Sequence, residues 1–368
     1  MGIPLLDTRP EVDSIWTELN EALQRVMKSG QFIMGPDVKE LEKEIAAYMG
    51  AKHAVGCNSG TDALVMGIAA LGVGVGDEVI TSPFTFFATS EAITHAGAIP
   101  VFVDIDPYTY NLDVSQIERA ITPRTKVIIP VHLYGHSVDM DPILELAAKC
   151  GIKVLEDVAQ AFGSEYKGKK ASTIGDAGAL SFFPSKNLGA FGDGGMLITN
   201  DDNIADTVRM LRVHGARKKY FNEVAGYNSR LDTLQAAILR VKLPHIEDWN
   251  RGRREAADRY NELLLDVEGV GTPVEADYTK HVYHQYTIRL TGSDRDLVQK
   301  KLQDLQVGSM VYYPVPLHKL PVYADLSYKL PESEKAADQV ISLPIWPSID
   351  IDTQKQVVDA IKTAVSAC

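Results

Sequence analysis

The sequence has few cysteines and no long apolar run, and these two absences exclude several classes of protein. Its 368 residues include only Cys57, Cys150 and Cys368, which are odd in number and widely spaced. They fit neither a disulfide framework nor the spacing of metal ligands, so we expect a reduced, cytoplasmic protein without a structural metal. No apolar run approaches the roughly 18 residues of a membrane-spanning helix, and the first residues lack the apolar core of a signal peptide.

Basic charge is also scarce. The chain has 37 lysines and arginines against 49 acidic residues, which gives a net charge of −12. This balance argues against nucleic acid or an anionic membrane surface as a partner, although a local positive pocket can still bind a small anion. The remaining composition, 45% apolar and 23% charged, is that of a globular protein large enough for two domains.

Apolar runs alternate with amphipathic stretches over the first 200 residues. Strand-like runs lie at 53–57, 78–81, 99–103, 126–131, 152–156, 177–183 and 195–199, with helical patterns at 11–29, 37–49, 61–71, 87–96, 114–120 and 140–149. This alternation predicts an α/β domain whose mostly parallel sheet is covered by helices on both faces. Further on, the patterns predict helices at 203–212, 230–265, 294–304 and 352–366, strands at 284–290 and 309–312, and a polar, exposed segment at 214–228. We therefore expect a large domain at 1–255 and a smaller α+β domain at 256–368.

One lysine lies between an apolar strand and a glycine-rich segment, in SFFPSKNLGAFGDGG at 181–195. A strand that ends at Pro184 would bring Lys186 to the rim of a crevice. Lost hydration there lowers the pKa of an amine, and the free amine can act as a nucleophile. Read alone, such a lysine is more often a solvated loop residue. Support for a reactive lysine must therefore come from the residues at the other strand ends.

Polar groups follow the first strand in CNSGTDAL at 57–64. Gly60 and Thr61 would place backbone N–H groups and a hydroxyl at the positive end of a helix, which suits a phosphate. An ordinary N-cap is the alternative interpretation. Ser181 could add another hydroxyl to a phosphate site.

Acidic and aromatic residues follow two other strands. In KVLEDVAQ at 153–160, alternation points Glu156 and Asp157 to opposite faces, so one of them should face the crevice, with Gln160 beside it if a turn begins there. Such a carboxylate could hold a proton on a heterocyclic nitrogen; a solvated strand-end acid is the alternative. In TSPFTFF at 81–87, one aromatic could stack on a planar ring while the others fill the core. Pyridoxal phosphate requires donors for its phosphate, an aromatic ring stacked on its own ring, a carboxylate at its ring nitrogen and a lysine. The residues at these strand ends could together supply all four.

Ordered motifs cover nearly the whole chain. They are GQFIMGPDVKELE (30–42), NSGTDAL (58–64), GDEVITSPFTFFAT (76–89), PVFVDIDPYTYNLD (100–113), VIIPVHLYGH (127–136), VLEDVAQAFGSEYKGK (154–169), SFFPSKNLGAFGDGG (181–195), GYNSRLDTLQAAIL (226–239) and YYPVPLHK (312–319). In these the chain resembles the DegT/DnrJ/StrS nucleotide-sugar aminotransferases. The resemblance implies the aspartate aminotransferase-like fold type I, with a large α/β domain and a smaller C-terminal α+β domain.

The resemblance also implies a role for individual residues. Lys186 would be the Schiff-base lysine and proton shuttle, and Asp157 would contact the pyridinium nitrogen. The cofactor contacts it implies are Gly60, Thr61, Phe86, Gln160, Ser181 and Asn228, the last from the other subunit of a homodimer. The substrate contacts would be Arg230, Tyr312 and His318. Phe162 stands where many relatives have histidine, which could alter substrate shape. Tyr312 also stands where relatives often have histidine, and this departure bears on the sugar contacts at that position.

The implied reaction passes an amino group from glutamate, which leaves as 2-oxoglutarate, to a nucleotide-linked keto-sugar, with pyridoxal phosphate cycling through pyridoxamine phosphate. The motifs most resemble enzymes that aminate C3 of UDP-linked 2-acetamido sugars, including the 3-oxo-glucuronate, whose carboxylate Arg230 could bind. Such products serve amino-sugar and lipopolysaccharide biosynthesis. A 4-keto dTDP- or UDP-sugar aminotransferase, a pyridoxal phosphate-dependent sugar dehydratase and a non-catalytic sensor are the alternatives.

Overall fold

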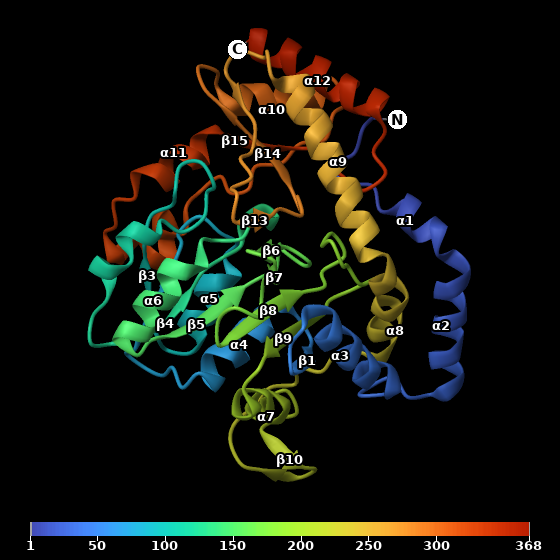
Figure 1. Ribbon diagram of the computed structural model, residues 1–368, viewed down its shortest axis with the longest axis vertical. Helices are drawn as coiled ribbons and strands as arrows, with labels where there is room; N and C mark the ends of the chain where they lie inside the picture. Colours follow the sequence, from blue (N-terminus) through green and yellow to red (C-terminus); the bar gives the residue numbers. More distant parts are fainter. Residues whose placement is uncertain (1, 368) are drawn as a thin grey trace.

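A computed structural model describes residues 2–367 (Figure 1). Its helices are α1 (Arg9–Ser14), α2 (Trp16–Ser29), α3 (Pro36–Met49), α4 (Gly60–Ala70), α5 (Ala88–His95), α6 (Met140–Cys150), α7 (Asp202–Leu211), α8 (Thr233–Lys242), α9 (Ile246–Leu264), α10 (Arg295–Asp304), α11 (Pro331–Gln339) and α12 (Ile351–Ser366). Short 3₁₀ turns are η1 (Val114–Gln116), η2 (Glu118–Ala120), η3 (Leu133–Gly135), η4 (Leu243–His245), η5 (Leu317–Lys319) and η6 (Pro321–Leu326). None of the helices within residues 2–367 has both the length and the apolar character to cross a membrane.

A seven-stranded sheet forms the centre of the large domain. Its strands are β1 (His53–Cys57), β2 (Glu78–Thr81), β3 (Ile99–Phe102), β4 (Thr125–Ile129), β5 (Lys153–Asp157), β8 (Ala177–Ser181) and β9 (Gly195–Thr199), in the order β1-β9-β8-β5-β4-β2-β3. β9 pairs antiparallel with both β1 and β8, and the other neighbouring pairs are parallel. The mixed, mostly parallel sheet predicted from the alternating pattern is confirmed, with every predicted strand of this domain present.

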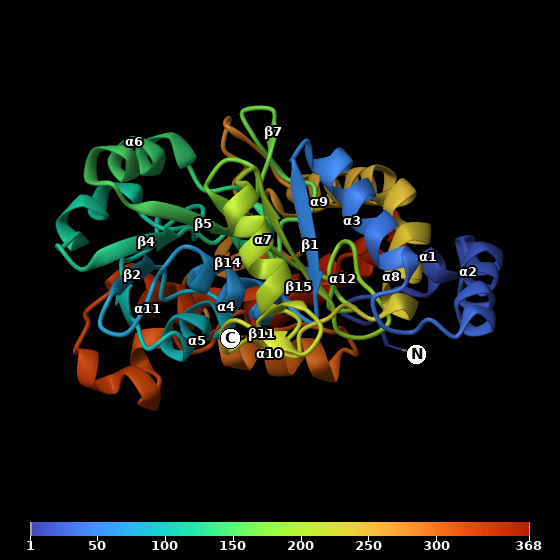
Figure 2. The same ribbon diagram turned by 90° about the horizontal axis from the view of Figure 1, so that it is seen from below.

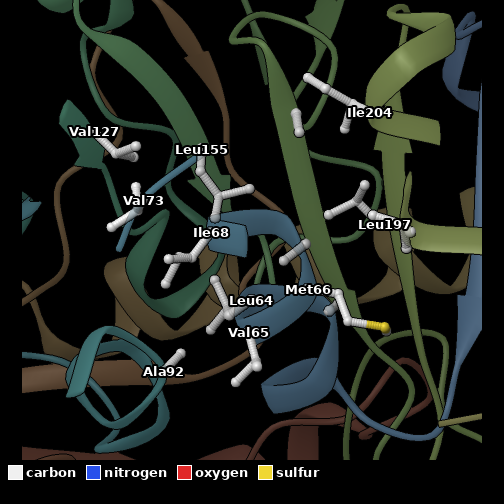
Figure 3. Packing of buried hydrophobic residues seen from close by; sticks show 14 of the residues in the cluster. Leu64, Val65, Met66, Ile68, Val73, Ala92, Val127, Leu155, Leu197 and Ile204 are labelled. Atoms are coloured by element: carbon white, nitrogen blue, oxygen red, sulfur yellow. The ribbon is translucent and has the colours of Figure 1, made fainter. Parts of the chain in front are cut away.

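Helices cover both faces of the sheet, as expected for strands that are apolar on both sides. α4, α5 and α7 pack on one face, and α3, α6 and α8 on the other (Figure 2). Figure 3 shows Leu64 and Ile68 of α4 against Val127, Leu155 and Leu197 of the sheet. A Cβ at Gly67, within α4, would lie only 2.9 Å from a Leu197 methyl group. The absence of a side chain there lets α4 lie close to the strands whose ends carry the site.

The smaller C-terminal part has its own core around a three-stranded antiparallel sheet. That sheet has the order β12-β14-β15 and contains β12 (Val270–Gly271), β14 (Tyr286–Leu290) and β15 (Val340–Leu343). Its core includes residues of α9, α10 and α12, and Ile3 and Leu6 pack against it. α9 runs without interruption past position 255, so the domain boundary at 255/256 stays a prediction.

Short strands complete the structure. β6 (Glu165–Tyr166), β7 (Lys169–Lys170) and β13 (Thr279–Lys280) form a small sheet, and β10 (Ala216–Lys218) and β11 (Phe221–Asn222) form a hairpin within the polar segment 214–228. The hairpin extends away from the body of the molecule (Figure 1). Its aromatic residues Tyr220 and Phe221 are exposed.

Four predicted elements differ from the structure. The helix expected at 11–29 is divided at Ile15 into α1 and α2, and the helical stretch expected at 114–120 consists of the 3₁₀ turns η1 and η2. The long helix expected at 230–265 is divided into α8 and α9 by η4, because Pro244 lacks the N–H group that a continuous helix requires. The strand expected at 309–312 is reduced to a single bridge between Met310 and Ser342. Of the cysteines, Cys57 is buried and Cys150 exposed, both unpaired thiols, while Cys368 lies outside the described residues.

Candidate active site

Lys186 sits in a tightly closed loop between β8 and β9. Its backbone N–H donates to the carbonyl of Phe183 at 2.8 Å, and the N–H of Ala190 closes the loop on the carbonyl of Phe182 at 2.8 Å. A Cβ at Gly189 would lie 2.4 Å from the carbonyl oxygen of Pro184, so only glycine fits this close approach. The loop therefore presents Lys186 in a fixed position.

The amine of Lys186 is electrostatically prepared for nucleophilic chemistry. Burial lowers the pKa of Lys186 to about 8, and the negative charge of Asp157 acts in the opposite direction. The charge of Asp157 acts on this ammonium through space, with no side-chain hydrogen bond among the causes of the shift. At pH 7 about a tenth of the Lys186 side chains are therefore uncharged, far more than at the ordinary pKa of 10.5, and this uncharged form is the nucleophile.

Asp157 ends β5 and is only 4% exposed. Its Oδ2 accepts a hydrogen bond from the hydroxyl of Thr89 at 2.8 Å, and its Oδ1 accepts from the N–H of Ala159 at 3.1 Å. Burial raises the pKa of this carboxyl, while these two hydrogen bonds and the charge of Lys186 lower it. Burial dominates, so the pKa of Asp157 lies above its ordinary value. In its ionised form the carboxylate can accept a hydrogen bond from a protonated ring nitrogen.

Its neighbour Glu156 faces the other side of the sheet, as strand alternation requires. Glu156 accepts hydrogen bonds from the backbone N–H groups of Ser172, Ile174 and Gly175. Its Oε2 also lies 3.0 Å from Nε2 of buried His132. The question left open by the sequence is answered: Asp157 faces the Lys186 side, and Glu156 is an internal structural carboxylate.

Gln160 is held beside Asp157. Its Oε1 accepts from the N–H of Tyr134 at 2.8 Å, and its Nε2 donates to the hydroxyl of Tyr313 at 2.9 Å. The ring of Phe86 lies 6.3 Å from the ring of Tyr313 and is 58% exposed, whereas Phe84 is fully buried. Of the strand-end aromatics, Phe86 is the one available to a planar ligand.

Gly60 and Thr61 begin α4 directly beside the end of β8. A Cβ at Gly60 would lie 2.7 Å from the Cβ of Ser181, so the helix start and Ser181 are in contact. The hydroxyl of Ser59 accepts from the N–H of Asp62 at 3.0 Å, which is the N-cap that the sequence left as an alternative. The cap leaves the N–H groups of Gly60 and Thr61 without an intrahelical partner. An N-cap and a phosphate cradle are therefore compatible here.

Asn228 and Arg230 lie next to this helix start. Asn228 is exposed and forms a bridge with Val213, and the hydroxyl of Ser229 donates to Asp62 at 2.7 Å. The Nε of Arg230 is buried and has no hydrogen-bond partner in the part of the chain that the structure describes. The side chain of Asn228 is thus turned outward, while Arg230 has hydrogen-bonding capacity to spare.

The remaining predicted residues are placed less directly. Tyr312 is half-buried, and its carbonyl accepts a hydrogen bond from the hydroxyl of Tyr134. His318 is buried with Nε2 at 3.0 Å from Glu334 on α11, so its direct contact with a sugar stays a prediction. Phe162 stacks on Tyr48 at 5.4 Å inside the core. Any effect of Phe162 on the shape of the substrate site would therefore be indirect.

Two residues of this cluster were not assigned from the sequence. Thr89, on α5, supplies a hydroxyl to Asp157, and Tyr313 supplies one to Gln160. The signal for Thr89 is a threonine on the buried face of a helix that starts beside the aromatic strand end. Tyr313 gave no such signal because it approaches the cluster from the far end of the sequence.

The residues present fit pyridoxal phosphate. Lys186 offers an amine with a lowered pKa, Asp157 offers a buried carboxylate that accepts from only two neutral donors among the described residues, and the start of α4 offers N–H groups for a phosphate. Phe86 could cover one face of the ring.

Comparison with known proteins agrees with this fit. The structure aligns with that of Streptomyces venezuelae DesV in complex with a ketimine intermediate at a TM-score of 0.95 and 42% identity, covering 98% of both chains. It also aligns with Bacillus subtilis NtdA with bound cofactor PMP at a TM-score of 0.90 and 34% identity, covering 98% of this chain and 83% of NtdA. Fold and site together define a pyridoxal phosphate-dependent sugar aminotransferase.

More particularly, the chain belongs to the DegT/DnrJ/EryC1/StrS aminotransferase family, whose profile matches residues 13–362. It is 51% identical over 98% of both chains to a pleiotropic regulatory protein of Geobacillus stearothermophilus. It is also 47% identical to the UDP-2-acetamido-2-deoxy-3-oxo-D-glucuronate aminotransferase of Pseudomonas aeruginosa, over 98% of this chain and 99% of that one.

Proposed function

We propose that the protein transfers the amino group of glutamate to the 3-keto group of a UDP-linked 2-acetamido sugar, with the 3-oxo-glucuronate as the preferred form. The catalytic part of the proposal is carried by the Lys186 amine and its lowered pKa beside the buried Asp157. The carboxylate preference is supported by the buried, unpartnered Nε of Arg230 among the described residues, because a guanidinium can bind a carboxylate through two parallel hydrogen bonds. The product would be a precursor for the biosynthesis of lipopolysaccharide or another surface polysaccharide.

Bound pyridoxal phosphate would supply an aldehyde that takes up the amino group and a ring that withdraws electrons from the reacting carbon. The chain supplies the rest. Nζ of Lys186 removes the proton from the α-carbon of the amino donor and returns a proton to the sugar carbon in the second half-reaction. Asp157 keeps the ring nitrogen protonated through a charge-assisted hydrogen bond. Gly60, Thr61 and Ser181 would hold the phosphate.

We further propose that the working unit is a homodimer with shared sites. In the single chain Phe86, Phe183 and Phe191 are exposed around the candidate site, and so is the hairpin bearing Tyr220 and Phe221. Large exposed apolar patches mark protein–protein interaction sites, so we assign these aromatic side chains to an interface. A second copy would cover them and bring its own Asn228 toward the phosphate.

The test of substrate is a panel of UDP- and dTDP-linked 3-keto and 4-keto sugars, with and without a C6 carboxylate, offered to the pyridoxamine form. We expect the fastest recovery of the pyridoxal form with the UDP-linked 3-oxo-glucuronate. Arg230→Met should weaken binding of the UDP-linked 3-oxo-glucuronate by roughly ten- to a hundredfold and leave binding of the non-acidic 3-keto sugar unaffected. The matched control is Arg251→Met on the exposed face of α9. An equal loss with both sugars would contradict the carboxylate role.

A sensor without turnover is the second candidate, because the relative from Geobacillus stearothermophilus is a pleiotropic regulatory protein and another relative, from Saccharopolyspora erythraea, is a sensory transduction protein. The lowered pKa of Lys186 favours turnover. Adding glutamate to the purified holoprotein separates the two. Loss of the yellow colour with formation of 2-oxoglutarate supports transamination, and an unchanged spectrum supports the sensor.

A further inference from the structure

A second buried lysine lies behind the loop of Lys186, and the proposed mechanism does not use it. Lys242 is the last residue of α8 and is only 3% exposed. Its Nζ donates to the carbonyl oxygen of Gly189 at 2.6 Å. The same ammonium lies 5.7 Å from the ring centre of Phe191 and 5.6 Å from that of Trp249. Since Gly189 and Phe191 both belong to the β8–β9 loop, this lysine supports the segment that carries Lys186.

Few charges face this ammonium. Glu11 on α1 and Arg253 on α9 are both buried and act on it through space. Burial lowers the pKa of Lys242, and the negative charge of Glu11 opposes that shift, while the guanidinium of Arg253 adds to it. Burial likewise raises the pKa of Glu11, and the two cations oppose that rise. Glu11 is therefore the counter-charge that helps keep Lys242 protonated.

Three other contacts hold the same loop. Asn187 donates through Nδ2 to Oδ1 of Asn250 at 2.7 Å and to the carbonyl of Val282 at 3.0 Å. The N–H of Phe191 donates to Oε1 of Gln235 at 2.9 Å. These are neutral hydrogen bonds, whereas the bond from Lys242 is charge-assisted and therefore stronger. Gly189 is three residues from Lys186, so a displacement of this carbonyl would be transmitted to the catalytic amine through a closed, tightly bonded loop.

We infer that Lys242 is a positioning residue for Lys186: its ammonium fixes the carbonyl of Gly189, with Glu11 as counter-charge, and so sets where the Lys186 amine lies relative to Asp157. The inference rests on Lys186 being the lysine that joins the cofactor. It predicts that loss of the charge on Lys242 weakens cofactor binding and shifts the pH midpoint of the bound cofactor's visible absorbance, even if the fold is kept.

The test compares Lys242→Met with Lys242→Arg. We expect Lys242→Met to bind pyridoxal phosphate about tenfold more weakly, because a buried charge-assisted hydrogen bond is lost, and to shift the pH midpoint of the visible absorbance of the bound cofactor. Lys242→Arg keeps a charged donor and should recover most of both properties. Glu11→Gln should shift the midpoint in the same direction as Lys242→Met. The control is Lys43→Met on the exposed face of α3, which should match the unaltered protein.

An unchanged affinity and an unchanged midpoint in Lys242→Met would overturn the inference. So would a lower melting temperature with an unchanged midpoint, which would mean that Lys242 only fills space. If Lys242→Met does not fold, Lys242→Gln replaces it: the inference requires a shifted midpoint for Gln and not for Arg, and equal midpoints refute it. Lys186→Ala tests the proposed function separately from the role of Lys242. Visible absorbance of the bound cofactor that persists in this variant refutes the proposed function itself.

Discussion

At the scale of single residues, Lys186 is under two opposing influences. Burial removes water from its ammonium, and the carboxylate of Asp157 attracts it. Burial dominates, so the pKa falls to about 8 from the ordinary 10.5. In the folded, cofactor-free protein the charged form of this amine is therefore less stable than in the unfolded chain. The free energy of unfolding should depend on pH for this reason.

Between pH 8 and 10.5 the unfolded chain binds more protons at position 186 than the folded chain, so the free energy of unfolding contributed by this residue rises with pH. Lys186→Met removes this effect. At pH 7 we expect the cofactor-free variant to be more stable than the unaltered protein by on the order of 2 kcal/mol, after allowance for partial solvent access. Urea denaturation at pH 7 and pH 10 should show the difference shrinking as pH rises. A difference that is constant with pH would contradict the lowered pKa.

Thr89 offers a second test at this scale. Its hydroxyl lowers the pKa of Asp157 by donating to Oδ2. Thr89→Val leaves this buried acceptor unpaired, so the pKa of Asp157 should rise and the acidic limb of the kcat/KM profile should move to higher pH. The free energy of unfolding should also fall by about 1–3 kcal/mol. Thr89→Ser keeps the hydroxyl and serves as the control; equal pH profiles for Val and Ser would show that the bond does not tune Asp157.

At the scale of elements, the site depends on how closely the start of α4 approaches the end of β8. Gly60→Ala would place a methyl group 2.7 Å from the Cβ of Ser181 and 3.2 Å from its hydroxyl. We expect the helix start to move, the cofactor to bind about tenfold more weakly, and the protein to lose about 1–3 kcal/mol of stability. Gly74→Ala is the control, since no atom lies within 4 Å of its Cβ. Equilibrium titration with pyridoxal phosphate and thermal unfolding measure both effects.

The sequence predicted the central elements well because their signals are local. β5, for example, is an apolar run that ends at a polar turn, and α4 begins at a capping serine. The parts that it missed depend on distant partners. β6 and β13 pair Tyr166 with Thr279 across more than a hundred residues. The first-turn N–H groups of α11 donate to the carboxylate of Asp104 in the large domain.

The same distinction applies to the site. Lys186, Asp157 and Gln160 follow strands whose carboxyl ends must meet at one edge of the sheet, so their proximity follows from topology. Tyr313 and Lys242 reach the cluster and the lysine loop from other elements, and only three-dimensional contacts reveal them. Strand alternation alone left the choice between Glu156 and Asp157 open, because it fixes that they diverge but not which faces the crevice. Only the family resemblance indicated Asp157.

At the scale of the whole molecule, a shared site can be tested by complementation. If Asn228 holds the phosphate at the site that contains the other subunit's Lys186, exchange between inactive Lys186→Ala and weakened Asn228→Ala gives mixed dimers with one intact site. Random exchange should restore about a quarter of the unaltered activity, since half of the dimers are mixed and each has one of two sites. The measurement is the glutamate half-reaction after subunit exchange. Activity that stays at the level of the separate variants would contradict a shared site.

The start of the chain lies against its last third. Ile3 forms a parallel bridge with Val307, and the carbonyl of Leu5 accepts from the N–H of Ile345, and both ends of the chain lie at the same side of the molecule (Figure 1). During synthesis the first residues must therefore wait for roughly three hundred others before their partners exist, a separation that slows folding. A ribosome-bound intermediate would carry Ile3 and Leu6 uncovered, which makes the nascent chain a candidate for chaperone capture until release.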